Sequence, residues 1–150
     1  MIVWVEKRLV SALHDRQLAE HGGSAGLRDA GLLDSALARP KQLLAYGSPT
    51  PDLADLAASL AFGLARNHAF VDGNKRTAYV ASRTFIELNN ARLEADNKEK
   101  YLTFLSLGEG HLSESELAIW FRKHMRLIPP DSVQEQSRHY NKRNRQKDTQ

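Results

Sequence analysis

The stretch "TPDLADLAASLAFGLARNHAFVDGNKRT", residues 50–77, decides the fold because it joins a strongly apolar helical pattern to a turn rich in polar side chains. Apolar residues from Leu53 to Leu64 recur at the i, i+3, i+4, i+7 spacing of one helix face. Thr50 is a suitable N-cap residue, and the proline after it suits the first helical position. The sequence therefore predicts a helix that ends near Asn67, and its broad apolar face predicts that it is central and buried.

Helical spacing continues on both sides of this stretch. It predicts further helices over residues 5–21, after the loop at 22–29, from about 74 to 89, over 97–107 and after Ser113. Because Pro40 disfavours helical conformation at the residue before it, we expect the second helix to break there. Only "ARLEA", residues 91–95, could be a short extended piece. The predicted fold class is all-α, with about six or seven helices around one central buried helix.

Length and composition predict one globular domain, residues 1–130, followed by a basic tail, residues 131–150. The chain of 150 residues has no cysteine, which excludes disulfides and thiolate metal sites and agrees with a reducing compartment. No apolar run is long enough for a membrane span. Charges at residues 6–8 interrupt the place where a signal peptide is apolar, so we expect a cytoplasmic protein.

The tail carries five of the basic residues and three of the acidic ones, so the first 130 residues are nearly neutral. A function in nucleic-acid binding would therefore have to depend on the tail. Its low apolar content predicts a solvated and poorly ordered segment. Two interpretations stay open, namely a flexible end without specific function and a segment that contacts RNA or acidic partners.

The turn at residues 68–76 combines the groups that a polyphosphate site requires. It leads into the first turn of a helix, where free backbone N–H groups and a partial positive charge favour a phosphate. Gly73 allows close approach of a ligand to the backbone, and Asn74 can donate a hydrogen bond. Lys75 adds a point charge, and Arg76 offers a planar fork that matches phosphate oxygens. We therefore expect these four residues to bind a nucleotide or phosphate.

The same turn carries a candidate base and a candidate metal ligand. Asp72 suits Mg²⁺, which takes few protein carboxylates and keeps phosphate oxygens and water as its other ligands. His68 can accept a proton from an attacking hydroxyl near neutral pH. Phe70 is expected to anchor the loop in the core. Taken singly, these residues could be a surface pair, a solvated cation and an ordinary turn. Together they are what transfer from a nucleotide requires.

The sequence "HAFVDGNKR", residues 68–76, resembles the core motif of the Fic/Doc family, His-x-Phe-x-Asp/Glu-Gly-Asn-Gly/Lys-Arg. Lys75 stands where most Fic enzymes have a second glycine and where the Doc branch has lysine. The likeness covers roughly residues 4–125, including "LHD" at 13–15 and "HGGSAGLRDAGLLDSALARP" at 21–40. The resemblance implies a Doc-type toxin of a toxin–antitoxin system.

Carried over residue by residue, the resemblance implies that His68 is the general base for a Ser/Thr hydroxyl of a protein target. It implies that Asp72 holds Mg²⁺, that Gly73 and Asn74 form an anion hole, and that Arg76 binds a phosphate of ATP. The implied reaction is transfer of the γ-phosphate, with elongation factor Tu as the known type of target and arrest of translation as the result. The alternative is AMP transfer of the Fic type, which Gly73 keeps open because some Doc-like sequences have alanine there.

The family also implies how such a protein is inhibited. Many Fic enzymes carry an inhibitory Ser/Thr-x-x-x-Glu-Gly/Asn helix, which this sequence lacks, so we expect a small antitoxin whose C-terminal segment blocks the site. A non-catalytic docking module is a further alternative. Outside the motif, His14 is expected to have a packing or hydrogen-bonding role. Arg28 with Asp29 is expected to form a salt-bridged loop and helix cap, and the alternative is that the two residues line an edge where a strand of the target docks.

Overall fold

The computed structural model describes residues 1–129. The elements in chain order are α1 (Lys7–His21), α2 (Ala30–Tyr46), α3 (Leu53–Asn67), α4 (Asn74–Leu88), β1 (Ala91–Leu93), α5 (Asn97–Gly108), α6 (Glu114–His124) and β2 (Met125–Leu127). The prediction of an all-α fold is confirmed, since this part of the chain contains six helices and one sheet of two short strands. The expectations for the tail, residues 131–150, lie outside the described residues.

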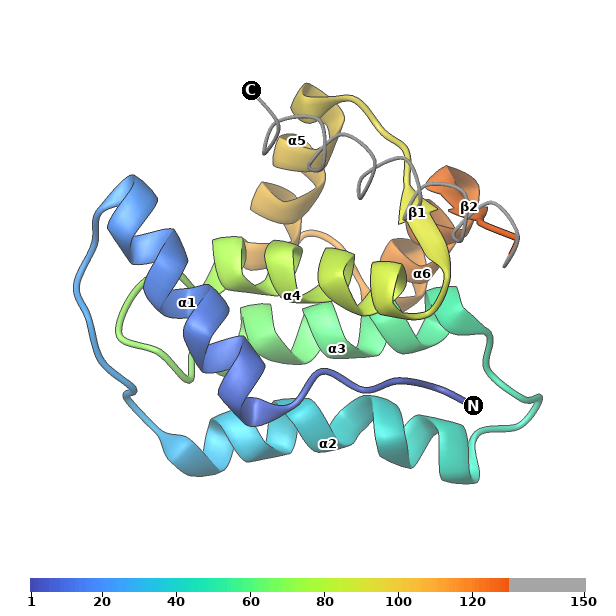
Figure 1. Cartoon of the computed structure of the whole chain (residues 1–150), viewed down its shortest axis with the longest axis horizontal. Helices are drawn as coiled ribbons and strands as arrows, with labels where there is room; N and C mark the ends of the chain where they lie inside the picture. The colour runs from blue at the N-terminus through green and yellow to red at the C-terminus, as the bar shows by residue number, and fades with distance from the viewer. Residues whose placement is uncertain (130–150) are drawn as a thin grey trace, which may run out of the picture.

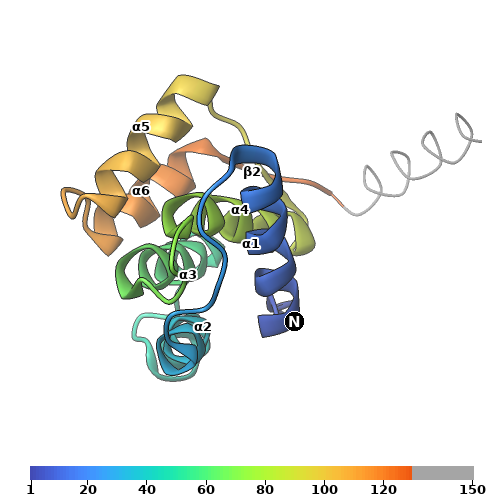
Figure 2. The same ribbon diagram turned by 90° about the vertical axis from the view of Figure 1, so that its left-hand side faces the viewer.

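Helix α3 is the central element, as its apolar pattern predicted (Figure 1). Ten of its fifteen residues are buried. It packs against α2, α4 and α6, and Figure 2 shows α2 on one side of the α3–α4 pair with α5 and α6 on the other. Gly63 permits close packing, because a Cβ atom there would lie 3.2 Å from the Cα of Ala36 in α2. This arrangement fixes both ends of α3 in space.

Helix α2 does not break at Pro40, contrary to the expectation from the sequence. It continues to Tyr46, and Pro40 itself is buried. A proline inside a helix costs about 3 kcal/mol. Beyond it, Leu43 and Leu44 are partly buried against the core, and each contributes part of the roughly 1.5–3 kcal/mol that full burial of a leucine side chain is worth. Tertiary packing therefore outweighs the local preference, which a rule based on the neighbouring residue cannot include.

The N-cap of α3 is Asp52 rather than Thr50. The carboxylate of Asp52 accepts a hydrogen bond from the Asp55 backbone N–H at 2.9 Å, and the carboxylate of Asp55 accepts one from the Asp52 N–H at 3.0 Å. Arg122 of α6 donates to both carboxylates. The capping box and Arg122 together favour Asp52 as the N-cap, two residues after Thr50, which the sequence had predicted.

The short extended piece expected at residues 91–95 is confirmed as β1, which pairs antiparallel with β2. Ala91 lies opposite Leu127 in the register, and Leu93 lies opposite Met125. The sequence did not predict β2, because three residues are too few for a recognisable alternation.

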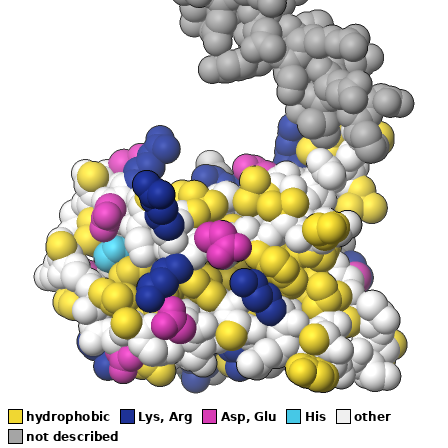
Figure 3. All heavy atoms as spheres, turned by 60° about the horizontal axis from the view of Figure 1, so that its bottom comes forward, with side chains coloured by type: hydrophobic (Ala, Val, Ile, Leu, Met, Phe, Trp, Pro, Cys, Tyr) yellow, Lys and Arg dark blue, Asp and Glu magenta, His cyan; other side chains and the backbone are white. Residues whose placement is uncertain are grey.

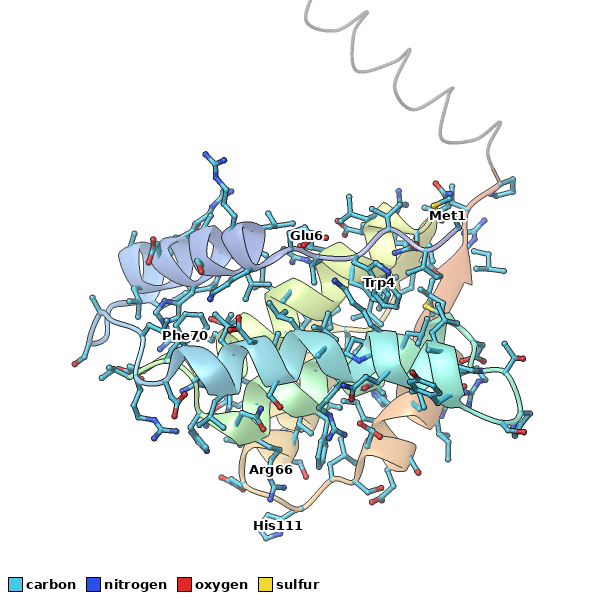
Figure 4. The ribbon with its side chains drawn as sticks, turned by 90° about the horizontal axis from the view of Figure 1, so that it is seen from below. Met1, Trp4, Glu6, Arg66, Phe70 and His111 are labelled. Atoms are coloured by element: carbon cyan, nitrogen blue, oxygen red, sulfur yellow. The ribbon has the colours of Figure 1, made fainter. Side chains whose placement is uncertain are left out.

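The N-terminal segment runs from Met1 through Trp4 to Glu6 before α1 begins (Figure 4). Trp4 stacks on Phe85 of α4 with ring centroids 5.8 Å apart.

The face on the α2 side has apolar side chains gathered over one half and charged side chains of both signs elsewhere (Figure 3). Within residues 1–129, the helices are too short or too polar to cross a bilayer.

Candidate active site

A cleft of about 890 Å³ lies between the end of α1, the loop that joins α3 to α4, the beginning of α4, and α5. Its volume is in the range of small-molecule and cofactor sites. All six residues that the sequence singled out line this cleft, namely His68, Asp72, Gly73, Asn74, Lys75 and Arg76. The structure therefore brings the candidate base, the candidate metal ligand and the candidate anion-binding residues to one place. The opposite wall, from α5, includes Lys100, Tyr101 and Phe104, which no sequence motif had indicated.

His68 terminates α3 in a left-handed backbone conformation, with φ 50° and ψ 49°. This conformation costs a residue other than glycine about 1–2 kcal/mol. It turns the chain sharply out of the helix and leaves the His68 side chain exposed at the cleft. The neighbouring Ala69 and Phe70 are buried, so the turn is anchored on its far side. A strained residue held by its surroundings is typical of a functional position.

The carboxylate of Asp72 is held by two backbone N–H groups. Oδ1 accepts from Gly73 at 2.8 Å, and Oδ2 accepts from Ser24 at 3.2 Å. These hydrogen bonds, first that of Ser24 and then that of Gly73, lower the pKa of Asp72, and the charge of Arg76 lowers it further. The carboxylate is therefore ionised at neutral pH and held between the α1–α2 loop and the start of α4.

The single carboxylate of Asp72 is chemically compatible with a magnesium ion that takes its other ligands from phosphates and water. Among residues 1–129, no group of three or more His, Cys, Asp or Glu side chains could hold a metal by itself. Mg²⁺ commonly binds through one or two carboxylates together with substrate phosphates and water. Asp72 could therefore hold Mg²⁺ together with phosphates at the start of α4.

The side chain of Asn74 also holds the loop that carries the candidate site. Its Oδ1 accepts a hydrogen bond from the Phe70 N–H at 3.1 Å, and its Nδ2 donates to the Phe70 carbonyl at 2.9 Å. The residue is only 8% exposed, and its side chain closes the loop on itself. The side-chain amide keeps a second N–H, and the backbone N–H lies at the start of α4, so the contribution of Asn74 to an anion site stays a prediction.

The start of α4 has no side-chain cap, because its N-cap residue is Gly73. Gly73 is left-handed, with φ 77°, a conformation that glycine adopts without strain. The first backbone N–H groups of α4 belong to residues that line the cleft. Together with the charges of Lys75 and Arg76, they make this end of the cleft suitable for an anion.

Lys75 crosses from α4 to α5. Its aliphatic stem lies over Gly108, where an added methyl group would overlap Cγ and Cδ of the lysine. The Lys75 stem therefore lies against the end of α5 and borders the cleft there. Arg76 is half-buried in the same wall.

His14 supports the loop from α1. The side chain is 2% exposed, its ring stacks on Phe70 with centroids 3.8 Å apart, and its Nε2 lies 2.7 Å from the carbonyl oxygen of Asp72. With the proton on Nε2, His14 donates to that carbonyl. The expected packing and hydrogen-bonding role of His14 is confirmed, as is the expected anchoring role of Phe70, which Figure 4 shows beside α1.

Arg28 and Asp29 do not form the expected salt bridge with each other. Asp29 caps α2 by accepting a hydrogen bond from the Leu32 N–H at 3.0 Å. Arg28 instead donates to backbone carbonyls at the end of α3. The cap was predictable from an aspartate before a helical pattern, whereas the contact of Arg28 with a segment 40 residues away in sequence had no local signal.

Comparison with known proteins agrees with the motif. The model of the Fic/DOC family matches residues 4–86. The chain is 55% identical over 76 residues to "Toxin Doc" of Mycolicibacterium smegmatis, an alignment that covers 50% of this chain and 58% of that protein. It is 31% identical over 112 residues to "Protein kinase doc" of Escherichia phage P1, which covers 75% of this chain and 87% of that protein. The family match, the identity to two Doc proteins and the cleft around residues 68–76 show that the chain belongs to the Fic/Doc family.

Proposed function

We propose that this protein transfers the γ-phosphate of ATP to a Ser or Thr hydroxyl of a protein target. The observation that carries the proposal is the convergence of His68, Asp72 and the uncapped start of α4 on one cleft. The names of the two relatives, a toxin and a protein kinase, support it. In this proposal the protein is a toxin of a toxin–antitoxin system, and elongation factor Tu is the expected target from the family resemblance.

The nucleotide would lie with phosphates at the start of α4. Backbone N–H groups of the first turn, the guanidinium of Arg76 and the ammonium of Lys75 supply the positive charge that a triphosphate needs. Asp72 would hold Mg²⁺, which neutralises charge on the phosphate oxygens when it is bound. Most of the rate enhancement would come from positioning and charge neutralisation.

His68 would act on the incoming hydroxyl. The imidazole takes the proton as the hydroxyl oxygen forms a bond to the γ-phosphorus, the bond from that phosphorus to the bridging oxygen breaks, and ADP leaves with the electron pair. The exposure of the His68 side chain at the cleft supports this role, because a base must reach its substrate. General base catalysis of this kind contributes about 10²- to 10⁴-fold in rate.

AMP transfer is the second candidate, and Gly73 is the observation that favours it. A glycine with φ 77° at the start of α4 matches the Fic form of the motif. Lys75 opposes this candidate, because its stem and charge occupy the border between α4 and α5, where another phosphate would otherwise lie.

Isotope labelling separates the two reactions. The purified protein is incubated with Mg²⁺, a bacterial cell extract and ATP labelled at either the γ- or the α-phosphate, and a His68→Ala variant is the control. We expect label on a protein only from γ-labelled ATP, and mass spectrometry should find an added phosphate on Ser or Thr. Label from α-labelled ATP, with an added AMP, would establish the second candidate instead.

Nucleotide titration tests whether the cleft is a catalytic site or only a docking module. We expect ATP with Mg²⁺ to bind the wild type, and we expect a Lys75→Gly, Arg76→Ala double variant to bind at least about tenfold more weakly, since two charged phosphate contacts are lost. Absence of binding by the wild type would favour a module that docks a partner without catalysis.

Inhibition would come from a second protein. In this proposal a small antitoxin covers the cleft with its C-terminal segment. Production of the toxin alone should stop bacterial growth, whereas production together with an antitoxin encoded beside it should not. Equal toxicity of the wild type and the His68→Ala variant would argue against transfer as the cause of toxicity.

A further inference from the structure

We propose that Arg28 is a positioning residue, whose guanidinium holds His68 in the backbone conformation that presents its imidazole to the cleft. This inference rests on the proposed function, since it concerns the candidate base. It depends on contacts between the α1–α2 loop and the end of α3, and Arg28 touches neither the phosphate-binding residues nor Asp72 in these contacts.

The backbone of the α1–α2 loop fixes the residues directly after His68. The N–H groups of Arg28 and Asp29 both donate to the Ala69 carbonyl, at 2.7 and 3.0 Å. The Val71 N–H donates to the Gly26 carbonyl at 3.0 Å, which completes a short antiparallel bridge. These bonds use backbone atoms alone, so a change of the Arg28 side chain leaves them in place.

The side chain of Arg28 then reaches back over the end of α3. Its Nε donates to the His68 carbonyl at 2.7 Å, and one terminal nitrogen donates to the Asn67 carbonyl at 3.1 Å. These are carbonyls that a helix end leaves without intrahelical partners, and a cation there also interacts favourably with the helix dipole. The planar guanidinium matches two adjacent carbonyls, which a lysine cannot bridge in the same geometry.

The contact matters for the base because His68 is strained. With φ 50°, its backbone lies in a region that residues other than glycine rarely occupy. Asn67 before it is tied to α2 through a hydrogen bond from its side chain to the Leu32 carbonyl at 2.9 Å. The peptide that joins residues 68 and 69 is fixed by the Arg28 fork on the His68 carbonyl. Without the fork, that peptide can rotate and change the direction in which the imidazole points.

Arg28 is exposed, so its replacement should not disturb the core. We expect Arg28→Gln to lower kcat for phosphate transfer about 10- to 100-fold, since a displacement of about 1 Å at a reacting group has effects of this size. KM for ATP should change less than about twofold, because the phosphate-binding groups are untouched. Arg28→Lys should recover only part of the loss. Arg126→Gln is the matched control, since Arg126 of β2 pairs with Glu94 on the surface away from the cleft and should leave kcat unchanged.

A double-variant cycle distinguishes positioning from a general structural role. In a His68→Ala background, Arg28→Gln should have no further effect on the remaining rate, since the residue that it positions is gone. A further loss of about 10-fold or more in that background would overturn the inference.

An NMR measurement decides the inference without any transfer activity. With isotope-labelled histidine, Arg28→Gln should shift or broaden the imidazole signals of His68 and leave those of His14 unchanged, because His14 is held by Phe70 and Asp72. Unchanged His68 signals would overturn the inference, and so would equal changes at both histidines, which would indicate a general disturbance. A wild type that transfers no phosphate would reject the proposed function, while the NMR result would still decide the role of Arg28.

Discussion

The two ends of α3 use the same kind of side chain for different purposes. At the N-terminal end, Arg122 binds the carboxylates of Asp52 and Asp55, with Nε 2.8 Å from Asp52 Oδ2. At the C-terminal end, Arg28 binds two carbonyls and leaves the side chain of His68 exposed at the cleft. One arginine neutralises charges, and the other fixes a backbone.

The difference shows how stability and function are separated along one helix. The N-terminal end is a closed capping box with both of its carboxylates paired, and it does not border the cleft. The C-terminal end holds a strained histidine next to an uncapped helix start. Changes at the N-terminal end of α3 should alter the free energy of unfolding alone. Changes at the C-terminal end should alter the rate of phosphate transfer alone.

The largest effect is expected at the C-terminal end. His68→Ala should lower the rate of phosphate transfer about 10²- to 10⁴-fold, because the proposed base is lost. The melting temperature should not fall, since the exposed side chain contributes little to packing. Transfer assays and thermal unfolding of the same preparation would check this, and wild-type activity in the variant would remove His68 from the mechanism.

The next effect concerns the proposed magnesium ligand. Asp72→Asn keeps an acceptor for the Ser24 N–H but loses the charge. We expect affinity for ATP to fall about tenfold in the presence of Mg²⁺ and to be unchanged in EDTA, which calorimetric titration can measure. Because backbone hydrogen bonds lower the pKa of Asp72 from 3.8, the carboxylate should stay ionised from about pH 8 down to about pH 5, so the difference between wild type and variant should not arise from titration of Asp72 in that range. An equal loss of affinity in EDTA would contradict a metal role.

At the N-terminal end, Asp52→Ala should lower the free energy of unfolding by about 1 kcal/mol, which is typical of the loss of an N-cap. The side chain is 52% exposed, so its ion pair with Arg122 should add little to this value. Denaturant unfolding would measure the change. The rate of phosphate transfer per folded molecule should equal that of the wild type, and a loss of transfer would show that the two ends are coupled.

The smallest effect is expected when only the charge of Asp52 is removed, at the N-terminal end of α3. Asp52→Asn keeps a good N-cap and loses the ion pair, so we expect a change below about 1 kcal/mol at neutral pH. The hydrogen bond from Arg122 is the main reason that the pKa of Asp52 is lowered from 3.8 to about 2. A carboxylate with a lowered folded-state pKa contributes stability that is present above pH 3.8 and is lost as the pH falls toward 2. The stability difference between wild type and variant should therefore shrink over this window, and a constant difference would contradict the role of the charge.

The sequence was sufficient to predict most of the fold and the position of the site for a local reason. Residues 53–64 have one strongly periodic face, and the six candidate residues lie within nine positions, so both signals are contained in a short segment. Chain connectivity alone keeps such residues near one another. The helix start after Ser113 was predicted for the same reason, and a capping box of Ser113 and Glu116 is present there.

The features that could not be predicted depend on contacts between distant segments. Helix α2 passes through Pro40 because of packing against α3, and the role of Arg28 depends on a residue that lies 40 positions further along the chain. Asn74 lines the cleft, but the two hydrogen bonds of its side chain to Phe70 had no signal in the sequence. Local patterns locate the polar residues of a site, and only the folded structure shows which atoms are already bonded.

The central claim is that the turn at residues 68–76 binds ATP so that the His68 imidazole faces an incoming hydroxyl. A crystal structure with Mg²⁺ and a non-hydrolysable ATP analogue tests it most directly. We predict phosphates within hydrogen-bonding distance of the first N–H groups of α4, Mg²⁺ on Asp72, and the His68 imidazole beside the γ-phosphate. A triphosphate bound elsewhere, or a His68 ring turned away from it, would contradict this claim.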